Sequence, residues 1–150
     1  MLLCSSLVEG KIATNMMYMA DQEKKIGFIM CVCTGKCPGF SKMDIWDFIN
    51  RVRVELPVEY GFIHPQLCEE DGDRFLSDFL RPGRKYLIGA CAPNMQKKMF
   101  RDAFKQSNLD IEKDLIPLDI RDVTTDEAVK AVQKKLEEIE KRDGGKKVDG

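Results

Sequence analysis

The stretch KIGFIMCVCTGKCPGF, residues 25–40, passes from an apolar run into a segment rich in cysteine. Lys25–Cys33 lies between charged residues and a Thr-Gly pair, which is typical of a buried β-strand. Cys31, Cys33 and Cys37 fall within seven residues, close to the end of this predicted strand. A disulfide, a zinc ion, a reactive thiol and an iron–sulfur cluster all use clustered cysteines, so the rest of the chain must distinguish them.

Three further segments have the composition of strands, and each predicted strand precedes a segment with apolar residues at helical spacing. The further strands are predicted at Val58–His64, Lys85–Ala92 and Leu115–Ile120. The first helix is predicted to start at Ser41, with Asp44 in a weak capping box, and to stop at Pro57. The other helices are predicted to follow the acidic turn Glu69–Asp73, the N-cap Asn94 and the capping box Thr124–Glu127.

This alternation of strand and helix, repeated four times, predicts a single α/β domain. We expect a four-stranded, mainly parallel sheet with helices on both faces, a three-layer arrangement of the Rossmann or flavodoxin type. The apolar stripe of each helix should face the sheet, which for the third helix places Met95 and Met99 on the buried side. Trp46 is likewise expected in the core rather than on a contact surface.

The bulk composition is that of an ordinary globular chain. Of the 150 residues, 43% are hydrophobic and 33% are charged, which suits one domain with its own core. The formal net charge of -1 gives no field that would favour nucleic acid or an anionic membrane, and no apolar run is long enough to insert into a membrane. We expect the domain to span 25–142, with 1–24 a disordered extension and 143–150 a disordered tail.

No export signal is recognisable, so the cytoplasm is the expected compartment. Structural disulfides are rare there, and the six cysteines therefore indicate metal binding or redox chemistry. Cys4 lies outside the predicted domain and is assigned no role.

The cysteines of the predicted domain follow the ends of different strands. Cys31 and Cys33 end the first predicted strand, Cys68 follows the second, and Cys91 lies at the end of the third. The carboxyl ends of parallel strands meet at one edge of a sheet, and neighbouring strands are about 4.8 Å apart. Four such sulfurs can therefore bracket a cubane cluster. Helix N-termini at this edge would favour anionic sulfur, and nearby glycines would let backbone amides approach it.

Other polar residues near these strand ends have simpler interpretations. His64 is expected to be a strand-end residue held by a local hydrogen bond rather than a metal ligand. The acidic run Glu69–Asp73 is expected to be a polar turn. The basic face formed by Lys97, Lys98, Arg101 and Lys105 is expected to be solvated rather than a docking surface.

Three quoted segments together resemble one known family. They are KIGFIMCVCTGKCPGF, IHPQLCEEDG and YLIGACAPNMQKKMFRDAFKQSNLD. They are similar to the N-terminal domain of HdrA, the flavin-containing component of heterodisulfide reductase, and of related HdrA-like iron–sulfur proteins. In that family strands end in Cys-x-Cys, in a Leu/Met-Cys pair and in Ala-Cys-Ser-Pro-x-Met. The last pattern reads Ala-Cys-Ala-Pro-Asn-Met at 90–95 here, and Leu118–Asp122 (LDIRD) resembles the Asn-Ile-Arg segment of that family. The similarity covers roughly residues 25–141.

The resemblance implies one [4Fe-4S] cluster held by Cys31, Cys33, Cys68 and Cys91. It also implies a place in a flavin-based electron-transfer assembly of anaerobic metabolism. The implied partner is a flavin-containing HdrA-like subunit or another subunit of an iron–sulfur oxidoreductase.

Two departures from the family pattern bear on this interpretation. Relatives carry a Cys-Ser-Trp run soon after the Ile-Arg pair, whereas here Asp-Val-Thr-Thr follows; Cys37 is the candidate substitute if that cysteine is a ligand. Relatives also continue into a large flavin domain, and no dinucleotide-binding fingerprint occurs in this sequence. We therefore expect a free-standing electron carrier or subunit without catalytic residues of its own.

Two alternatives remain open at the level of sequence. A structural zinc module could use four cysteines, although close Cys-x₂-Cys pairs are absent. A thiol–disulfide protein could use Cys31 with Cys33 or Cys33 with Cys37, although no Cys-x-x-Cys occurs. No catalytic triad, phosphate-binding loop or pair of catalytic carboxylates indicates a hydrolase or a kinase.

Overall fold

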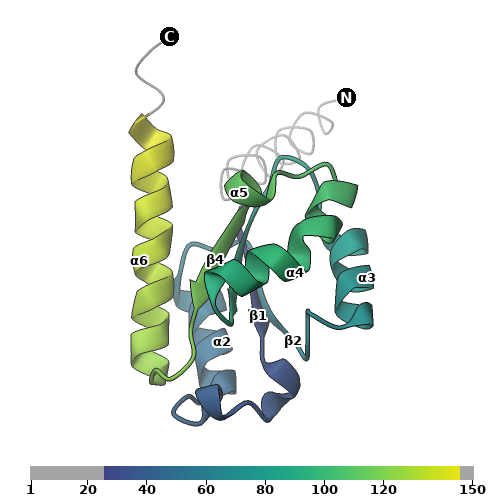
Figure 1. Ribbon diagram of the computed structural model, residues 1–150. Coiled ribbons are helices and arrows are strands. Elements are labelled where there is room, and N and C mark those ends of the chain that lie inside the picture. Colours follow the sequence, from purple (N-terminus) through teal and green to yellow (C-terminus); the bar gives the residue numbers. More distant parts are fainter. Residues whose placement is uncertain (1–25, 146–150) are drawn as a thin grey trace, which may run out of the picture.

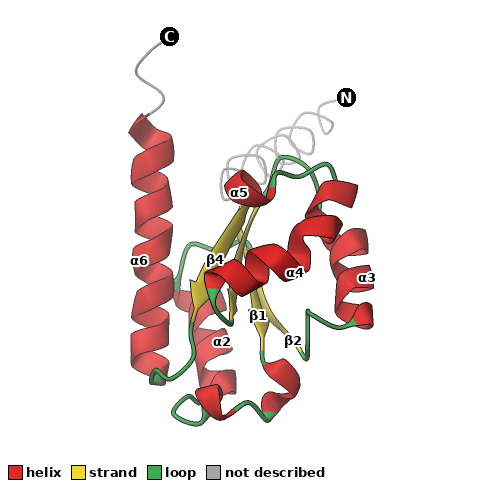
Figure 2. Cartoon of the chain, in the orientation of Figure 1, coloured by secondary structure: helices red, strands yellow, loops and turns green. Residues whose placement is uncertain are grey.

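The computed structural model describes residues 26–145 and contains one parallel sheet with strand order β2-β1-β3-β4 (Figures 1 and 2). The strands are β1 (Ile26–Cys31), β2 (Gly61–His64), β3 (Lys85–Ala90) and β4 (Leu115–Asp119). The helices are α2 (Ile45–Glu55), α3 (Glu70–Phe79), α4 (Pro93–Gln106), α5 (Ile111–Asp114) and α6 (Thr125–Gly144), and two 3-10 turns, η2 (Cys33–Gly35) and η3 (Pro38–Phe40), follow β1.

The sheet is the middle layer of three, as the sequence predicts. Alternate residues of β1 enter different cores because successive side chains of a strand point to opposite faces. Phe28 and Met30 pack with the apolar sides of α2 and α6. Ile29 and Cys31 pack with α3 and α4 on the other face. The predicted α/β class, the parallel pairing and the helices on both faces are therefore confirmed.

Several strand boundaries differ from the prediction by one to three residues, and at β1 and β3 this matters for the cysteines. β1 ends at Cys31, so Cys33 lies in η2 and not in the strand. β3 ends at Ala90, which leaves Cys91 one residue beyond the strand. The second strand is only Gly61–His64 rather than Val58–His64, although the carbonyl of Tyr60 still accepts a hydrogen bond from the Phe28 amide of β1.

Two predicted helix starts are wrong. Ser41 closes the η3 turn that begins at Pro38, and α2 begins after Asp44, whose carboxylate accepts a hydrogen bond from the Asp47 amide at 3.0 Å. α4 has Ala92 as N-cap rather than Asn94, because Pro93 occupies the first helical position, where its fixed φ is already helical. The short helix α5 was not predicted.

Three expected core residues are exposed. Trp46 is 71% exposed on α2, and Met95 and Met99 are 50% and 40% exposed on α4, whereas Phe100 on the same helix is buried. The predicted tail also starts too early, because α6 extends to Gly144. Residues 1–25 and 146–150, which hold the predicted extension and the rest of the tail, lie outside the described residues. Within 26–145 no helix combines the length and apolar character needed to cross a membrane.

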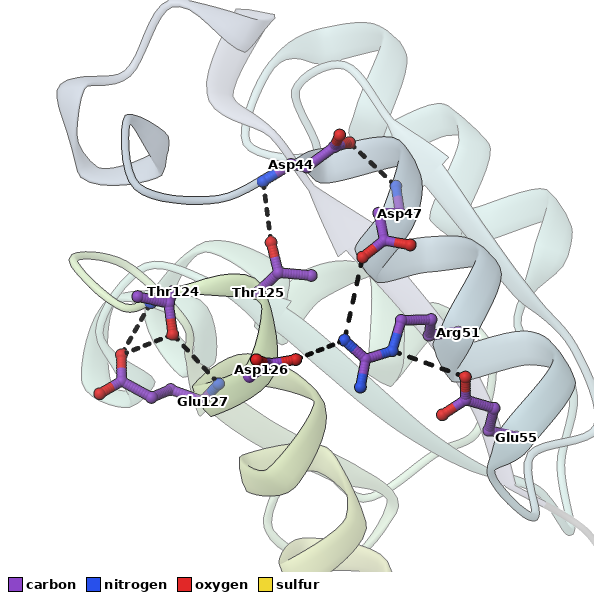
Figure 3. A network of polar contacts seen from close by, with 8 residues as sticks. All are labelled: Asp44, Asp47, Arg51, Glu55, Thr124, Thr125, Asp126 and Glu127. Atoms are coloured by element: carbon purple, nitrogen blue, oxygen red, sulfur yellow. Dashed lines mark hydrogen bonds and ion pairs between the residues drawn. The ribbon is translucent and has the colours of Figure 1, made fainter.

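A polar network joins α2 to the first turn of α6 (Figure 3). The Thr125 hydroxyl accepts a hydrogen bond from the Asp44 amide at 2.9 Å. The guanidinium of Arg51 lies 2.6 Å from an Asp126 carboxylate oxygen and also pairs with Asp47 and Glu55 on its own helix. This network fixes the start of α2 against α6, and with it the end of the loop that carries Cys33 and Cys37.

The predicted capping box of α6 is present. The Thr124 hydroxyl accepts a hydrogen bond from the Glu127 amide at 3.3 Å, and the Glu127 carboxylate accepts one from the Thr124 amide at 2.8 Å. The hydrogen bond from the Thr124 amide is the main cause that lowers the pKa of Glu127, and the hydrogen bond with the Thr124 hydroxyl is the second.

Replacing Thr124 by alanine is expected to lower the free energy of unfolding by about 1 kcal/mol, because alanine cannot satisfy the helix amide. Urea unfolding followed by circular dichroism would measure the change. Thr124→Ser keeps the hydroxyl and is expected to unfold at nearly the wild-type midpoint. Equal losses in both variants would contradict a capping role.

Candidate cysteine-lined redox site

The candidate site lies at the carboxyl edge of the sheet, next to a reversal in strand order. After β1 the chain forms β2 on one side of it, then returns to form β3 on the other side. The segments that follow β1 and β3 therefore diverge to opposite faces, which leaves space between their first residues. Figure 2 shows the loops that leave β1 and β2 at the same end of the sheet.

All five cysteines among residues 26–145 line one cavity of about 190 Å³ at this edge, which we call the cysteine pocket. They are Cys31, Cys33, Cys37, Cys68 and Cys91. The predicted convergence of cysteines from three strand ends is confirmed, and Cys37 joins them. The other lining residues are Phe40, Ala90, Met95, Gln96, Met99, Phe100 and Arg121. Thiols and apolar side chains thus dominate the walls, with one charged side chain among them.

The five thiols differ in environment. Cys31 is buried, and its sulfur accepts a hydrogen bond from the Leu67 amide at 3.3 Å. Cys33 and Cys68 are exposed, whereas Cys37 and Cys91 are half-buried. The Cys33 and Cys37 side chains both line the pocket and lie near each other. One thiol therefore anchors the site within the fold while others remain open to solvent.

Desolvation is the main cause of two raised thiol pKa values. The pKa of Cys33 is raised by desolvation and then by the negative charges that Cys37, Cys31 and Cys68 would carry as thiolates. The pKa of Cys91 is raised by desolvation and by Cys31 and Cys68, against the favourable charge of Arg121. Several thiolates in this pocket would repel one another, so a bound cation or a metal cluster would compensate for their charge.

The loop after β1 has an unusual backbone. Cys33, Thr34 and Gly35 have φ values of 49°, 65° and 74°. This left-handed conformation suits glycine, but in a β-branched residue such as Thr34 it costs roughly 1–3 kcal/mol. The Thr34 amide donates to the Pro65 carbonyl at 2.8 Å, which ties the loop to the end of β2. The fold thus maintains a strained turn that directs Cys33 and Cys37 to the pocket.

Gly72 permits a close contact beside Cys68. A Cβ atom at Gly72 would lie 2.4 Å from the carbonyl oxygen and 2.5 Å from the carbonyl carbon of Leu67. The first turn of α3 therefore packs directly on the backbone that precedes Cys68. The sequence predicts that glycines let backbone amides approach the sulfurs. The backbone amide that donates to a cysteine sulfur is that of Leu67, which is not a glycine. The role of Gly72 is to let α3 pack against the backbone of Leu67.

The pocket includes two polar residues that were not predicted as site residues. Arg121 follows β4 and is held by Asp119, whose carboxylate it contacts at 2.8 and 3.0 Å. Gln96 is completely buried; its amide nitrogen donates to the carbonyls of Cys91 and Leu118, while Oε1 has no partner among the described residues. Gln96 thus links the ends of β3 and β4 beneath the pocket. The sequence offered one signal for each residue: Arg121 follows a predicted strand end, and Gln96 lies near a predicted helix start.

The other polar residues considered in the sequence analysis lie outside the lining of the cysteine pocket. His64 accepts a hydrogen bond from the Gln66 amide at 3.1 Å and packs on Phe75, as expected of a strand-end residue. The acidic run Glu69–Asp73 is not a turn, because α3 starts at Glu70. Lys97 pairs with Glu112 at 2.5 Å, while Lys98, Arg101 and Lys105 are exposed on α4.

The donor set indicates what the pocket could hold. Within residues 26–145, no group of three or more His, Cys, Asp or Glu side chains is placed to hold a metal ion. Thiolate sulfur is nevertheless the ligand that iron–sulfur clusters use, and four cysteines suffice for one cubane. A cubane is wider than an ion, and each of its cysteines binds a different iron.

No protein-family model and no curated protein sequence matches this chain.

Proposed function

We propose that this domain is an electron-transfer module that holds one [4Fe-4S] cluster. The observation that supports this best is the cysteine pocket, where thiols from three strand ends line one apolar cavity. Catalytic sites that act on substrates usually combine acids, bases and nucleophiles, whereas this pocket offers thiols and one arginine. The cytoplasm and anaerobic metabolism remain the expected setting.

Cys31, Cys68 and Cys91 are the proposed ligands from the first, second and third strand ends, with Cys33 as the fourth. Cys37 is the substitute for Cys33, because it lines the same pocket and lies near Cys33. A cluster bound here would supply reversible one-electron chemistry. The Leu67 amide, which donates to the Cys31 sulfur, would stabilise negative charge on that ligand.

The proposed partner is a flavin-containing or iron–sulfur subunit of an oxidoreductase resembling heterodisulfide reductase. Exposure supports this: Cys33 and Cys68 are open to solvent, and Met95 and Met99 are exposed at the pocket lining. A redox centre at the surface can exchange electrons with a docked partner.

Protein purified without oxygen, or reconstituted with iron and sulfide, would test the proposal. We expect about four irons per chain and a broad visible absorbance that bleaches on reduction with dithionite. One colourless zinc per chain would instead make the domain a structural docking module. That result would contradict the proposal, as would protein without metal after anaerobic reconstitution.

A second candidate function is a dithiol redox protein using Cys33 and Cys37. The proximity of their side chains in the pocket and the exposure of Cys33 favour it. The raised pKa of Cys33 argues against it, since the thiolate is the attacking species. Metal-free protein with a Cys33–Cys37 disulfide that exchanges with small thiols would support this second function.

A further inference from the structure

Arg121 is held rigidly in the wall of the cysteine pocket. Its Nε and Nη2 atoms donate to the two carboxylate oxygens of Asp119 at 3.0 and 2.8 Å, and its backbone amide donates to Asp119 Oδ1 at 3.1 Å. Such paired contacts fix the plane of a guanidinium as well as its position. Asp119 is the last residue of β4, so the sheet itself provides the support.

The other side of Arg121 lies against the loop that follows β1. A Cβ atom at Gly39 would lie 3.0, 3.1 and 3.3 Å from Cβ, Cγ and Cδ of Arg121, so the aliphatic stem packs closely on this glycine. The carbonyl of Gly39 accepts a hydrogen bond from the Asp122 amide at 2.6 Å. The loop that carries Cys37 thus packs on the stem of Arg121, while Asp119 holds its guanidinium.

Arg121 is the only charged side chain among the described residues that line the cysteine pocket. Its positive charge acts on Cys91 and Cys37, which come from different segments of the chain. Asp119 is not among the lining residues, so the positive end of the ion pair faces the thiols. The Arg121 side chain is 37% exposed, so solvent partly screens its charge, and its effect on the site depends on its place in the pocket wall beside the thiols.

We propose that Arg121 is a positioning residue for charge: it stabilises the reduced, more negative state of the site and so raises its reduction potential. This inference rests on the proposed function, since it requires a redox centre held by the pocket cysteines. Adding one electron adds one negative charge, and a fixed cation at the wall favours the state with more negative charge. The Asp119 clamp means that the charge is already in place before the electron arrives.

The test is a redox titration of the full chain reconstituted with iron and sulfide, in which electron paramagnetic resonance monitors the reduced cluster. Arg121→Gln removes the charge and is expected to shift the midpoint potential to more negative values. Arg121→Lys retains a positive charge and is expected to stay closer to the wild type. Arg84→Gln is the matched control, because Arg84 pairs with Glu59 next to the start of β3, at the opposite edge of the sheet.

A shift for Arg121→Gln no larger than that for Arg84→Gln would overturn the inference while leaving the proposed function intact. Wild-type protein that assembles no cluster would overturn both. If Arg121→Gln assembles no cluster, Arg121→Lys decides: a cluster with a potential near that of the wild type supports a role of charge. Loss of the cluster in both variants shows that the shape of the arginine is required and overturns the electrostatic role.

Discussion

Replacing Cys91 by alanine is expected to reduce the iron bound after anaerobic reconstitution from about four atoms per chain to less than about one. Cys91 is the only cysteine of the pocket that follows β3, so no neighbour in sequence can take its place. The change should also remove the broad visible absorbance. Iron analysis and absorbance of the same anaerobic sample would measure both effects.

Cys37→Ala is the matched control, because Cys37 lines the same pocket and is equally half-buried. We expect it to keep most of its iron, since Cys33 remains to bind as the fourth ligand. Iron retained by Cys91→Ala would show that the ligand set is wrong. Iron lost from Cys37→Ala would instead show that Cys37 is the ligand and Cys33 the spare thiol. Circular dichroism of each variant separates loss of iron from loss of fold.

The layout of the fold was predictable because it depends on local pattern. The apolar run of β1 and the capping box of α6 each have a signature that a few residues determine. The cysteines follow three strand ends, and parallel pairing then places them at one edge whatever the detailed geometry. This is why their convergence could be predicted without knowing the strand order.

The detailed path of the chain at the site was less predictable. Val32 and Cys33 continue the pattern of β1, but the hydrogen bond from the Thr34 amide to Pro65 draws the chain into a left-handed turn instead. Arg121 gains its position from Asp119 and from Gly39, which is 82 residues away in sequence. Contacts of this kind exist only after folding, so spacing and propensity contain no signal for them.

The exposed methionines show the same limit. Met95 and Met99 have the spacing of a buried stripe, yet they lie beside the start of α4, where the helix passes the open pocket instead of the sheet. Helical periodicity predicts one apolar face but does not say what that face meets. At Met95 and Met99 it meets the cavity, whereas Phe100, which also borders the pocket, and Phe104 are buried in the core.

Replacing Gly72 by alanine is expected to destabilise the fold and also to weaken cluster binding. Helix propensity alone predicts the opposite, since alanine in place of glycine inside a helix stabilises it by roughly 1 kcal/mol. Here the new Cβ atom would lie 2.4–2.5 Å from the backbone of Leu67, which cannot rotate away as a side chain can. Overpacking of this kind costs about 1–3 kcal/mol, so we expect the steric cost to exceed the gain in propensity.

The strain should affect Cys68 first, because relief requires α3 or the Leu67–Cys68 backbone to move. Gly144→Ala is the matched control: Gly144 also lies in a helix, but a Cβ atom there meets nothing within 4 Å, so propensity should act alone. Urea unfolding of both metal-free variants would measure the stability, and iron content after reconstitution would measure the site. A Gly72→Ala protein at least as stable as the wild type would contradict the steric argument. If it folds but binds little iron, the close packing of α3 on Leu67 is what positions Cys68 as a ligand.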